Sequence, residues 1–403
     1  MGNSLLNSSG DYKEKQLPGA LVIGGDHPGL GVARSLGRRG VPVVVIDDQY
    51  SISTFSKYAT RAIRVKELRN ERRTVDTLLE VGRQYDLNGW VLFPTRDETV
   101  AAIARYREEL AGFYRVPCSD WEKVQWAWDK NKSYELAQQL DIPTPKTWNP
   151  KDISELESLY PHLPLAIKPA IKENFFYATG AKAWRAETPD ELNDLYKRAA
   201  KRIRQEEIMI QEIIPGDGSR QFSYCAFFHN GRSHSSLVAQ RCRQHPREFG
   251  RAATYVETVE SLEVEMLSER FLRAIDFYGL VEVEFKQDPR DNQYKLLDVN
   301  ARAWGFHCLG AAVGVDFPYI LYADQMGLPV EPKRAAPGVG WLRLITDVPT
   351  VITQMATGHL RLRDYFQSLK QTKIESVYAS EDPWPSVAEV VLLPYLAAKK
   401  YIV

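Results

Sequence analysis

The segment that decides the fold runs from residue 281 to 304, where VEVEF (281–285) and LLDVNARAW (296–304) flank the stretch DPRDN (288–292). Both flanking segments alternate β-forming residues with acidic or amide residues, and DPRDN has the composition of a turn. The pattern predicts two antiparallel strands joined by a hairpin.

Oxygen-bearing side chains are expected to converge on one face of this hairpin. Glu282 and Glu284 share a face, and a register set by the turn can bring Asp298 and Asn300 opposite them. Two carboxylates and an amide oxygen suit Mg2+, which also keeps water and substrate phosphates as ligands. Arg302 is in phase with Asp298 and Asn300 and would add a cation beside the metal. The alternative is an amphipathic hairpin with a solvated acidic face.

The composition excludes several classes of protein. A length of 403 residues indicates two or three domains. Lys plus Arg and Asp plus Glu number 52 each, so the zero net charge gives no general attraction to nucleic acid or to an anionic membrane. Four widely spaced cysteines favour reduced thiols in a cytoplasm, and no apolar run is long enough to span a bilayer. We expect residues 1–16 to form a disordered tail.

Residues 17–119 alternate apolar strands with helices, which predicts a Rossmann-like domain with a buried parallel sheet. RAIRV (61–65), WVLFPTRDE (90–98) and FYRVP (113–117) are expected to be further strands of that sheet. The dinucleotide motif G-x-G-x-x-G does not fit the glycines of this domain in any register. Asp47 and Asp48 nevertheless end the second strand, where an acid could bind a ribose, so a dehydrogenase stays an alternative.

A second unit is expected over residues 120–330, with a small α+β lobe at about 148–213. Its predicted order is a helix, the strand PLAIKPA (164–170), the irregular loop KENFFYATG (172–180), further strands and helices, and then the 281–304 hairpin. Residues 331–403 are punctuated by prolines, which favours a small C-terminal extension.

Charged residues precede the hairpin in a distinctive order. Lys130 begins a helix, and Lys168 lies inside an apolar strand, where a lysine needs an anion. Glu212 follows an apolar strand and precedes a Pro-Gly loop. Arg241 and Arg243 are expected to alternate on one strand face, as a phosphate or carboxylate clamp requires. A solvated arginine face is the alternative.

This order, closed by the pattern E-x(13)-D-x-N-x-R, resembles the ATP-grasp superfamily over roughly residues 120–329. Within it the chain looks most similar to the predicted ATP-dependent carboxylate-amine ligases. The resemblance implies an α/β and α+β chain in which a Rossmann-like, pre-ATP-grasp domain precedes a two-lobed ATP-grasp fold and a small C-terminal extension.

By the same resemblance, the nucleotide would be held at the interface of the two lobes. Lys130 and Lys168 would bind ATP phosphates from two sides of the cleft, and Lys172 would reach the phosphates from the loop that covers them. Glu212 would accept a hydrogen bond from the adenine amino group. The implied nucleotide-binding residues are Lys130, Lys168, Lys172, Gln211, Glu212, Ile213 and Ile214.

The chemistry implied by the resemblance depends on metal ions and fixed cations. Glu284 and Asp298 would bridge Mg2+ to the β- and γ-phosphates, with Asn300 completing the metal shell, Glu282 in a supporting role and Mn2+ as an alternative ion. Arg302, with Arg241 or Arg243, would stabilise the acyl phosphate and the oxyanion.

The chain departs from the family pattern at three places. The phosphate-covering loop, which is rich in glycine in many of these enzymes, contains only Gly180 here. Asp298 replaces the commoner glutamate of the metal motif. Gln221 stands where related chains often have an acid.

We therefore expect an enzyme that joins a small-molecule carboxylate to an amine, forming an amide through an acyl phosphate and releasing ADP and phosphate. A bicarbonate-activating carboxylase and a nucleotide-binding module without turnover are alternatives. Tyr255, Glu257, Trp304 and His307 are expected to be packing or surface residues, with substrate pockets as their alternative role. The assembly state is open, and a homodimer is among the alternatives.

Overall fold

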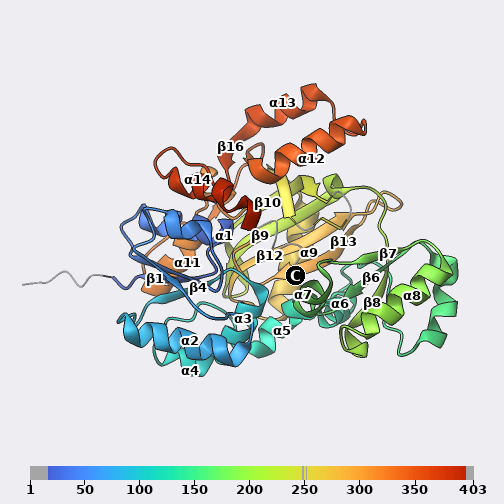
Figure 1. Cartoon of the computed structure of the whole chain (residues 1–403), viewed down its shortest axis with the longest axis horizontal. Coiled ribbons are helices and arrows are strands. Elements are labelled where there is room, and N and C mark those ends of the chain that lie inside the picture. Colours follow the sequence, from blue (N-terminus) through green and yellow to red (C-terminus); the bar gives the residue numbers. More distant parts are fainter. Residues whose placement is uncertain (1–16, 247–248, 251, 396–403) are drawn as a thin grey trace, which may run out of the picture.

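The computed structural model describes residues 17–246, 249–250 and 252–395. The tail expected over residues 1–16 lies outside the described residues. Figure 1 shows a large sheet in the middle of the molecule, flanked by an N-terminal unit on one side and a small lobe on the other. No helix in the described ranges has the length and apolar character needed to cross a bilayer.

The N-terminal unit is built on a parallel sheet with the strand order β3-β2-β1-β4. Its two central strands are completely buried because their residues are apolar on both faces, as parallel strands between helices require. The elements of this unit are β1 (Ala20–Ile23), α1 (His27–Gly37), β2 (Val43–Asp47), η1 (Ile52–Phe55), β3 (Arg61–Arg64), α2 (Glu71–Gln84), β4 (Val91–Pro94), α3 (Asp97–Arg105) and α4 (Arg107–Ala111).

The expectation of a strand at residues 113–117 is wrong. Only Arg115 bridges to Val91 of β4, through two backbone hydrogen bonds that involve Trp90 and Leu92. The Gly89 N–H also donates to the Phe113 carbonyl oxygen at 2.8 Å. Pro117 lacks the N–H that would extend the ladder beyond Arg115, so the segment forms a single bridge and not a strand.

The small lobe is an antiparallel sheet with the strand order β5-β8-β6-β7, covered by helices. Apolar residues on one face of this sheet pack against α8 and η2 in a core of their own. Two helices, α5 (Trp121–Trp128) and α6 (Lys130–Gln139), precede the lobe. Its elements are β5 (Thr147–Trp148), η2 (Ile153–His162), β6 (Leu165–Pro169), α7 (Lys172–Thr179), β7 (Trp184–Ala186), α8 (Pro189–Ala200), η3 (Gln205–Glu207) and β8 (Ile208–Glu212).

The expectation of an irregular loop over residues 172–180 is also wrong, because most of this segment forms the helix α7. The segment contains no glycine or proline before Gly180, so its backbone can continue helical hydrogen bonding. Gly180 ends the helix with φ of +68°, and its N–H donates to the carbonyl oxygen of Phe176 at 2.8 Å.

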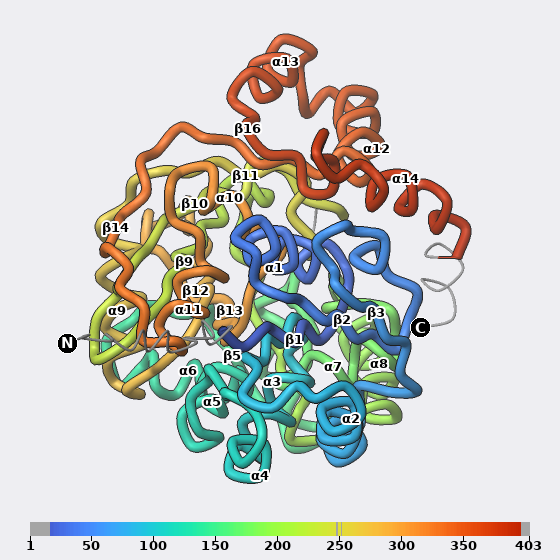
Figure 2. The backbone as a smooth tube through the Cα atoms, turned by 90° about the vertical axis from the view of Figure 1, so that its left-hand side faces the viewer, coloured from blue at the N-terminus to red at the C-terminus, as the bar shows by residue number. Residues whose placement is uncertain are grey.

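The large sheet has the strand order β13-β12-β9-β10-β11-β15-β16, with β14 paired to β10. One face packs on α9 and the other contributes to a core shared with β1, β2 and α1 of the N-terminal unit. Figure 2 shows this unit lying against the sheet. The elements are η4 (Gly218–Arg220), β9 (Gln221–His229), β10 (Arg232–His245), β11 (Ala252–Val259), α9 (Leu262–Ala274), β12 (Gly279–Gln287), β13 (Tyr294–Asn300), α10 (Leu309–Ala312), α11 (Phe317–Met326), β14 (Lys333–Arg334), β15 (Gly340–Leu342) and β16 (Thr372–Glu375).

The segment after residue 330 adds strands to this sheet, because β15 pairs with β11 and β16 pairs with β15. It also carries α12 (Leu344–Ala356), α13 (Leu362–Gln371) and α14 (Trp384–Val391). Figure 1 shows α14 returning to the N-terminal unit beside α1.

A buried charge fixes this return. Asp382 is fully buried and accepts hydrogen bonds from Arg34 Nε at 2.9 Å, from Ser56 Oγ at 2.6 Å and from the Lys57 N–H at 2.9 Å. Its neighbour Glu381 pairs with Arg38 instead, and both of those side chains are about 40% exposed.

We predict that Asp382→Ala lowers the free energy of unfolding by about 3–5 kcal/mol, because it leaves Arg34 buried without its partner. Glu381→Ala is the matched control, and it should cost at most about 1 kcal/mol because water screens the exposed pair. Urea unfolding of the two variants checks the prediction. Equal losses would show that Asp382 does not anchor the C-terminal segment.

Candidate active site

The predicted hairpin and its register are confirmed. Strands β12 and β13 are antiparallel, with Glu282 opposite Asn300 and Glu284 opposite Asp298. A hydrogen bond from the Asn292 N–H to the Asp288 carbonyl oxygen at 2.7 Å closes the turn between them. The four polar side chains therefore meet on neighbouring strands.

Glu284 lies in a network of three donors. Asn300 Nδ2 donates to Glu284 Oε1 at 3.0 Å, while Gln221 Nε2 and Arg241 Nη2 donate to Oε2 at 2.8 and 3.0 Å. Burial acts to raise the pKa of Glu284, but the positive charges of Arg241, Lys182 and Lys172 together hold this pKa below its usual range. The carboxylate is therefore ionised at neutral pH.

Asp298 is paired with a lysine from another element. Lys130, the first residue of α6, donates from Nζ to Asp298 Oδ1 at 2.6 Å. Burial opposes the charge on both groups, yet their attraction lowers the pKa of Asp298, with help from Lys172, and raises the pKa of Lys130. The expectation that Lys130 begins a helix is confirmed.

Glu282 is the innermost acid of the group, and no cation among the described residues donates a hydrogen bond to it. Its oxygens accept from Ser223 Oγ at 2.9 Å and from Asn300 Nδ2 at 3.1 Å. Burial, and then repulsion by Glu284, raise the pKa of Glu282 to about 7. It therefore holds a proton for part of the neutral range.

The donor set fits a divalent cation that keeps outside ligands. Within the described ranges, no group of three or more histidines, cysteines or acids is arranged to hold a metal ion. Glu284 and Asp298 nevertheless lie opposite each other as ionised carboxylates. Two carboxylates with water and phosphate oxygens are a usual Mg2+ set. The Asn300 amide oxygen faces Arg302 at 3.2 Å and Lys172 at 3.3 Å, so the amide would have to turn to join that set.

Lys168 extends into the same cleft from β6. Its Nζ donates to Tyr134 Oη at 2.9 Å and to Gln211 Oε1 at 2.8 Å. Both partners are neutral, and no carboxylate of the described residues pairs with this ammonium group. Its charge is therefore available to an anionic ligand.

The chain segment that joins the lobes lies beside Lys168. The Glu212 carboxylate accepts from the Lys146 N–H at 2.9 Å, from Arg290 Nη2 at 2.8 Å and from Lys295 Nζ at 3.3 Å. An adenine amino group would have to share an already paired carboxylate. The backbone of Ile213 and Ile214 also lines the cavity and offers further polar groups to a ring edge.

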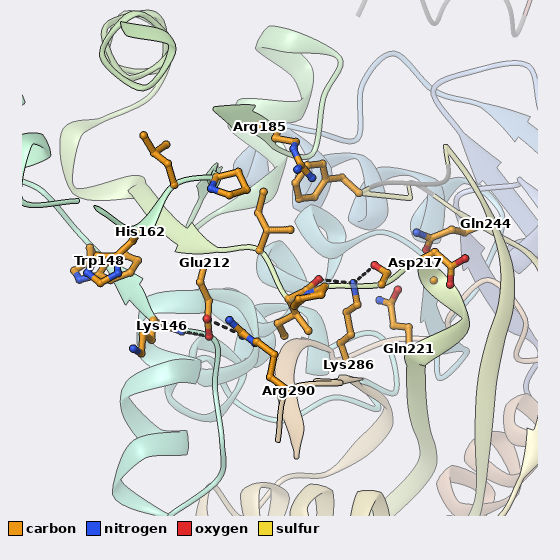
Figure 3. Close-up of a pocket in the computed structure, with 18 residues that line it drawn as sticks. Lys146, Trp148, His162, Arg185, Glu212, Asp217, Gln221, Gln244, Lys286 and Arg290 are labelled. Carbon is orange, nitrogen blue, oxygen red and sulfur yellow. Dashed lines mark hydrogen bonds and ion pairs between the residues drawn. The ribbon is translucent and has the colours of Figure 1, made fainter. Parts of the chain in front are cut away.

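These residues enclose one cleft between the small lobe and the large sheet. A cavity of about 200 Å³ is lined by ten of the residues predicted from the sequence: Lys130, Lys168, Lys172, Gln211, Glu212, Ile213, Ile214, Arg241, Glu284 and Asp298. It adjoins a pocket of about 540 Å³ (Figure 3), where Glu212 and Arg290 are paired and Lys286 points to the backbone of the 213–218 segment.

Arg302 lies just past the end of β13, outside the residues that line this cavity. Its guanidinium forms two hydrogen bonds with Asp97 of α3, and it reaches the Asn300 amide oxygen. Arg302 therefore lies beside the hairpin amide Asn300, and its place next to a metal ion stays a prediction.

The expectation that Arg241 and Arg243 share a strand face is wrong. Arg241 lies opposite Val256 and Arg243 opposite Tyr255, so β10 contains an extra residue at Cys242, which is a β-bulge. Arg241 faces Glu284 in the cleft. Arg243 instead forms two hydrogen bonds with the buried Asp347, at 2.8 and 2.9 Å.

Among the charged residues that were not predicted from the sequence, Lys182 and Lys286 line the cavity, and Asp97 lines a smaller pocket beside it with Lys130, Lys172 and Asp298. The Lys182 ammonium group lines the cavity and donates to the Gly250 carbonyl oxygen at 3.1 Å, and burial lowers its pKa to about 8. Asp97 follows the carboxyl end of β4, where parallel strands commonly place functional residues. That position was the one available signal for it.

Of the residues considered for a substrate pocket, Trp304 and His307 are packed in the interior, whereas Tyr255 and Glu257 line a separate pocket of about 430 Å³. Trp304 and His307 are buried, and His307 Nε2 lies 2.9 Å from the Pro28 carbonyl oxygen. Tyr255 hydrogen-bonds to Glu257 outside the cleft cavity.

The two acids that could have met a ribose are bound to an arginine. Arg96 Nη2 and Nη1 donate to Asp47 at 2.8 Å and to Asp48 at 2.9 Å. The Gly25 N–H also donates to Asp47, at 2.6 Å. This pairing weakens the dehydrogenase alternative.

Comparison with known proteins identifies chains that are similar in sequence or in fold. No protein-family model matches the sequence. A D-aspartate ligase of Enterococcus faecium (strain Aus0004) is 23% identical over 301 residues, which cover 70% of this chain and 70% of that protein.

Two solved structures share the architecture. The L-amino acid ligase from Bacillus licheniformis superposes with a TM-score of 0.60 at 15% identity, covering 79% of this chain and 76% of that one. The biotin carboxylase domain of the Hydrogenobacter thermophilus 2-oxoglutarate carboxylase, in complex with MgADP and bicarbonate, gives a TM-score of 0.63 at 18% identity, covering 81% and 74%. The ATP-grasp fold expected from the sequence is confirmed.

We predict a pH dependence that arises from Glu282. Its pKa is higher in the folded chain, at about 7, than the value near 4.3 expected when unfolded, so its contribution favours folding at low pH and is lost as pH rises between these values. Each pKa unit corresponds to about 1.4 kcal/mol. In EDTA, Glu282→Gln should therefore lose less stability than the parent between pH 5 and 8. Urea unfolding with parallel pH profiles for the two proteins would contradict this assignment.

Proposed function

We infer that this chain, which has the ATP-grasp fold, is an ATP-dependent ligase that joins a small-molecule carboxylate to an amine through an acyl phosphate. The observation that carries the proposal is the cleft in which Glu284 and Asp298 lie opposite each other while Lys168 pairs with no carboxylate in the part of the chain that the structure describes. Such a site is suited to a metal-bound polyphosphate. The similarity to a D-aspartate ligase and to an L-amino acid ligase supports the choice of carboxylate and amine.

We propose a division of the chain to match this function. Residues 17–119 would be the Rossmann-like, pre-ATP-grasp domain, and residues 120–330 the ATP-grasp domain with its small lobe at about 148–213. Residues 331–403 would form an extension that completes the large sheet. The strands β15 and β16 support this last role.

The nucleotide would lie in the cleft with its phosphates toward the hairpin. Lys168 and Lys130 would hold the phosphates from two sides, and Lys172 would add a third cation from the start of α7. The Gln211 side chain, which contacts Lys168, and the backbone of Glu212, Ile213 and Ile214 would bind the adenine end. Binding of the nucleotide would therefore change the contacts of Gln211 and Lys168 together, because the two side chains are hydrogen-bonded.

The metal would be held by Glu284 and Asp298, with Asn300 after its amide turns. Bound Mg2+ would neutralise charge on the β- and γ-phosphates and hold them in line. Mn2+ has similar oxygen preferences and is our proposed alternative. Lys130 and Arg241 compensate the two carboxylates in the structure and would be released to phosphate oxygens when a cation replaces them.

The chain's own cations would drive the two chemical steps. A substrate carboxylate oxygen attacks the γ-phosphorus, the bond to the β-phosphate oxygen breaks, and ADP leaves. The amine nitrogen then attacks the acyl carbon and gives up a proton to solvent, and phosphate leaves with the bonding electron pair. Arg302 and Arg241 would stabilise the negative charge that develops in each step. A closed cleft protects the acyl phosphate from water.

Replacing the two acids tests the metal assignment. Glu284→Gln combined with Asp298→Asn should lower ADP release with Mg-ATP by about 100-fold or more, because the charge that holds the cation is lost. Glu263→Gln combined with Asp276→Asn is the control, with the same change in charge at exposed positions. A folded double variant with the parent rate would show that the metal is held elsewhere.

A substrate screen separates the proposed reaction from its alternatives. ADP release should require both a carboxylate and an amine from a mixed library. Dependence on bicarbonate without an amine would identify a carboxylase, for which the similarity to a biotin carboxylase domain is the supporting observation. Nucleotide binding without release under every condition would identify a module without turnover.

Ligand-induced stabilisation tests the nucleotide assignment without turnover. At 100 times its dissociation constant, Mg-ATP should stabilise the protein by about 2.7 kcal/mol and raise the melting temperature. Lys168→Met should remove most of this shift, whereas Lys123→Met, which alters a surface ion pair, should leave it intact. A shift caused by NAD and not by Mg-ATP would favour a dehydrogenase.

A further inference from the structure

An acid from the N-terminal unit reaches the arginine proposed to stabilise the transition state. Asp97 is the first residue of α3 and follows β4 by two residues. Its oxygens accept from Arg302 Nε at 2.6 Å and from Arg302 Nη2 at 2.9 Å. A guanidinium bound through two parallel hydrogen bonds is fixed in both position and plane.

The same carboxylate holds a second cation of the cleft. Lys172, the first residue of α7, forms an ion pair with Asp97. Lys172 Nζ and Arg302 Nη2 also lie 3.3 and 3.2 Å from the Asn300 amide oxygen. Two cations from different elements are therefore placed side by side by one acid from a third.

All three groups are charged despite their burial. Burial would raise the pKa of Asp97, but Arg302 and Lys172 hold it well below its usual range. Burial would lower the pKa of Arg302 and of Lys172, but attraction by Asp97 raises the pKa of both. The cluster carries one net positive charge beside the hairpin acids.

The next residue of α3 holds the far end of α7. Tyr177 Oη donates to Glu98 Oε1 at 2.6 Å, and the Arg69 guanidinium lies 4.0 Å from the centre of the Tyr177 ring. Asp97 and Glu98 thus fix α7 at both ends against the N-terminal unit. The position of Lys172 depends on this contact between the unit and the small lobe.

We propose that Asp97 is a positioning residue of the ligase, which fixes the Arg302 guanidinium beside the hairpin residue Asn300 and keeps Lys172 next to it. This inference rests on the proposed function. An arginine that samples many rotamers would lose conformational entropy when it binds the transition state. A guanidinium already held in place by Asp97 has lost that entropy during folding, so it does not add to the activation barrier. The N-terminal unit would then supply an essential part of the active site.

The chain offers a matched control for this role. Arg243 and Asp347 form the same two-bond pair, with Nε–Oδ1 and Nη2–Oδ2 distances of 2.8 and 2.9 Å, in a buried place outside the cleft cavity. Asp347→Asn therefore removes the same kind of buried charge pair as Asp97→Asn. Any effect that reflects only lost stability should be shared by the two variants.

The kinetic experiment compares both variants below their melting temperatures. Asp97→Asn should lower kcat about 10- to 100-fold while the KM for the amine changes less than about threefold, as expected when an orienting partner is lost. Asp97→Glu should recover part of the rate, and Asp347→Asn should keep the parent kcat. Equal kcat values for Asp97→Asn and Asp347→Asn would overturn the inference.

A double-variant cycle tests whether Asp97 acts through Arg302. If it does, Asp97→Asn combined with Arg302→Gln should be no slower than Arg302→Gln alone. Losses that multiply would overturn the inference.

A spectroscopic measurement is independent of turnover. In protein with 15N-labelled arginine, the Arg302 Nε–H resonance, assigned by its loss in Arg302→Gln, should exchange slowly in the parent and rapidly in Asp97→Asn. Unchanged exchange would overturn the inference. Absence of ADP release from the parent protein with every substrate pair would overturn the proposed function instead, while the exchange experiment still decides whether Asp97 fixes Arg302.

Discussion

Removing three acids of one hairpin from water is the constraint on which the rest of this structure depends. Glu282, Glu284 and Asp298 lie on adjacent strands, and each ionised carboxylate would cost several kcal/mol to bury without compensation. The compensating cations come from distant elements, with Lys130 on α6 and Arg241 on β10. No cation of the described residues bonds to Glu282, and burial with repulsion by Glu284 raises its pKa to about 7, so this carboxyl is partly protonated near neutral pH. The acids can therefore be buried only when several parts of the chain have assembled around them.

The turn of the same hairpin is tied to the small lobe by ion pairs. Asp288 is buried in the turn and pairs with Arg290 and Lys295. Both cations also bind Glu212, the last residue of β8. One hairpin thus fixes the carboxylates at one end and the segment between the lobes at the other. A nucleotide in the cleft would contact two regions whose relative position is already determined by one element.

Local sequence patterns predicted this hairpin because strand alternation and turn composition lie within 24 consecutive residues. Lys130 and Lys168 were predicted for a related reason, since a helix start and an apolar strand are visible locally. The face of Arg243 was missed because a single extra residue in β10 changes the alternation, and nothing in the sequence around Cys242 marks a bulge. A loop was predicted in place of α7, although the segment has no glycine or proline before Gly180 and its backbone can therefore continue a helix.

Asp97 was missed for a different reason. Its partner Arg302 is 205 residues away, and the pairing exists only because the N-terminal unit packs beside the end of β13. Periodicity and spacing describe one element at a time, so charge pairs between units are outside their reach. The hairpin acids could be named from the sequence, whereas the residues that orient their surroundings required the tertiary structure.

The large sheet is completed by strands encoded far from its centre. Its acidic hairpin ends at residue 300, but β15 covers the edge of β11 only with residues 340–342, and β16 covers β15 with residues 372–375. During synthesis from the N-terminus, the ribosome must therefore add about 40 residues after the hairpin before this edge of β11 is paired, and about 75 before the sheet is complete. Until β15 has formed, the backbone N–H and C=O groups on this edge of β11 remain unpaired and can bind another nascent chain. The protein would depend most on chaperones during the interval between synthesis of the hairpin and synthesis of β15 and β16.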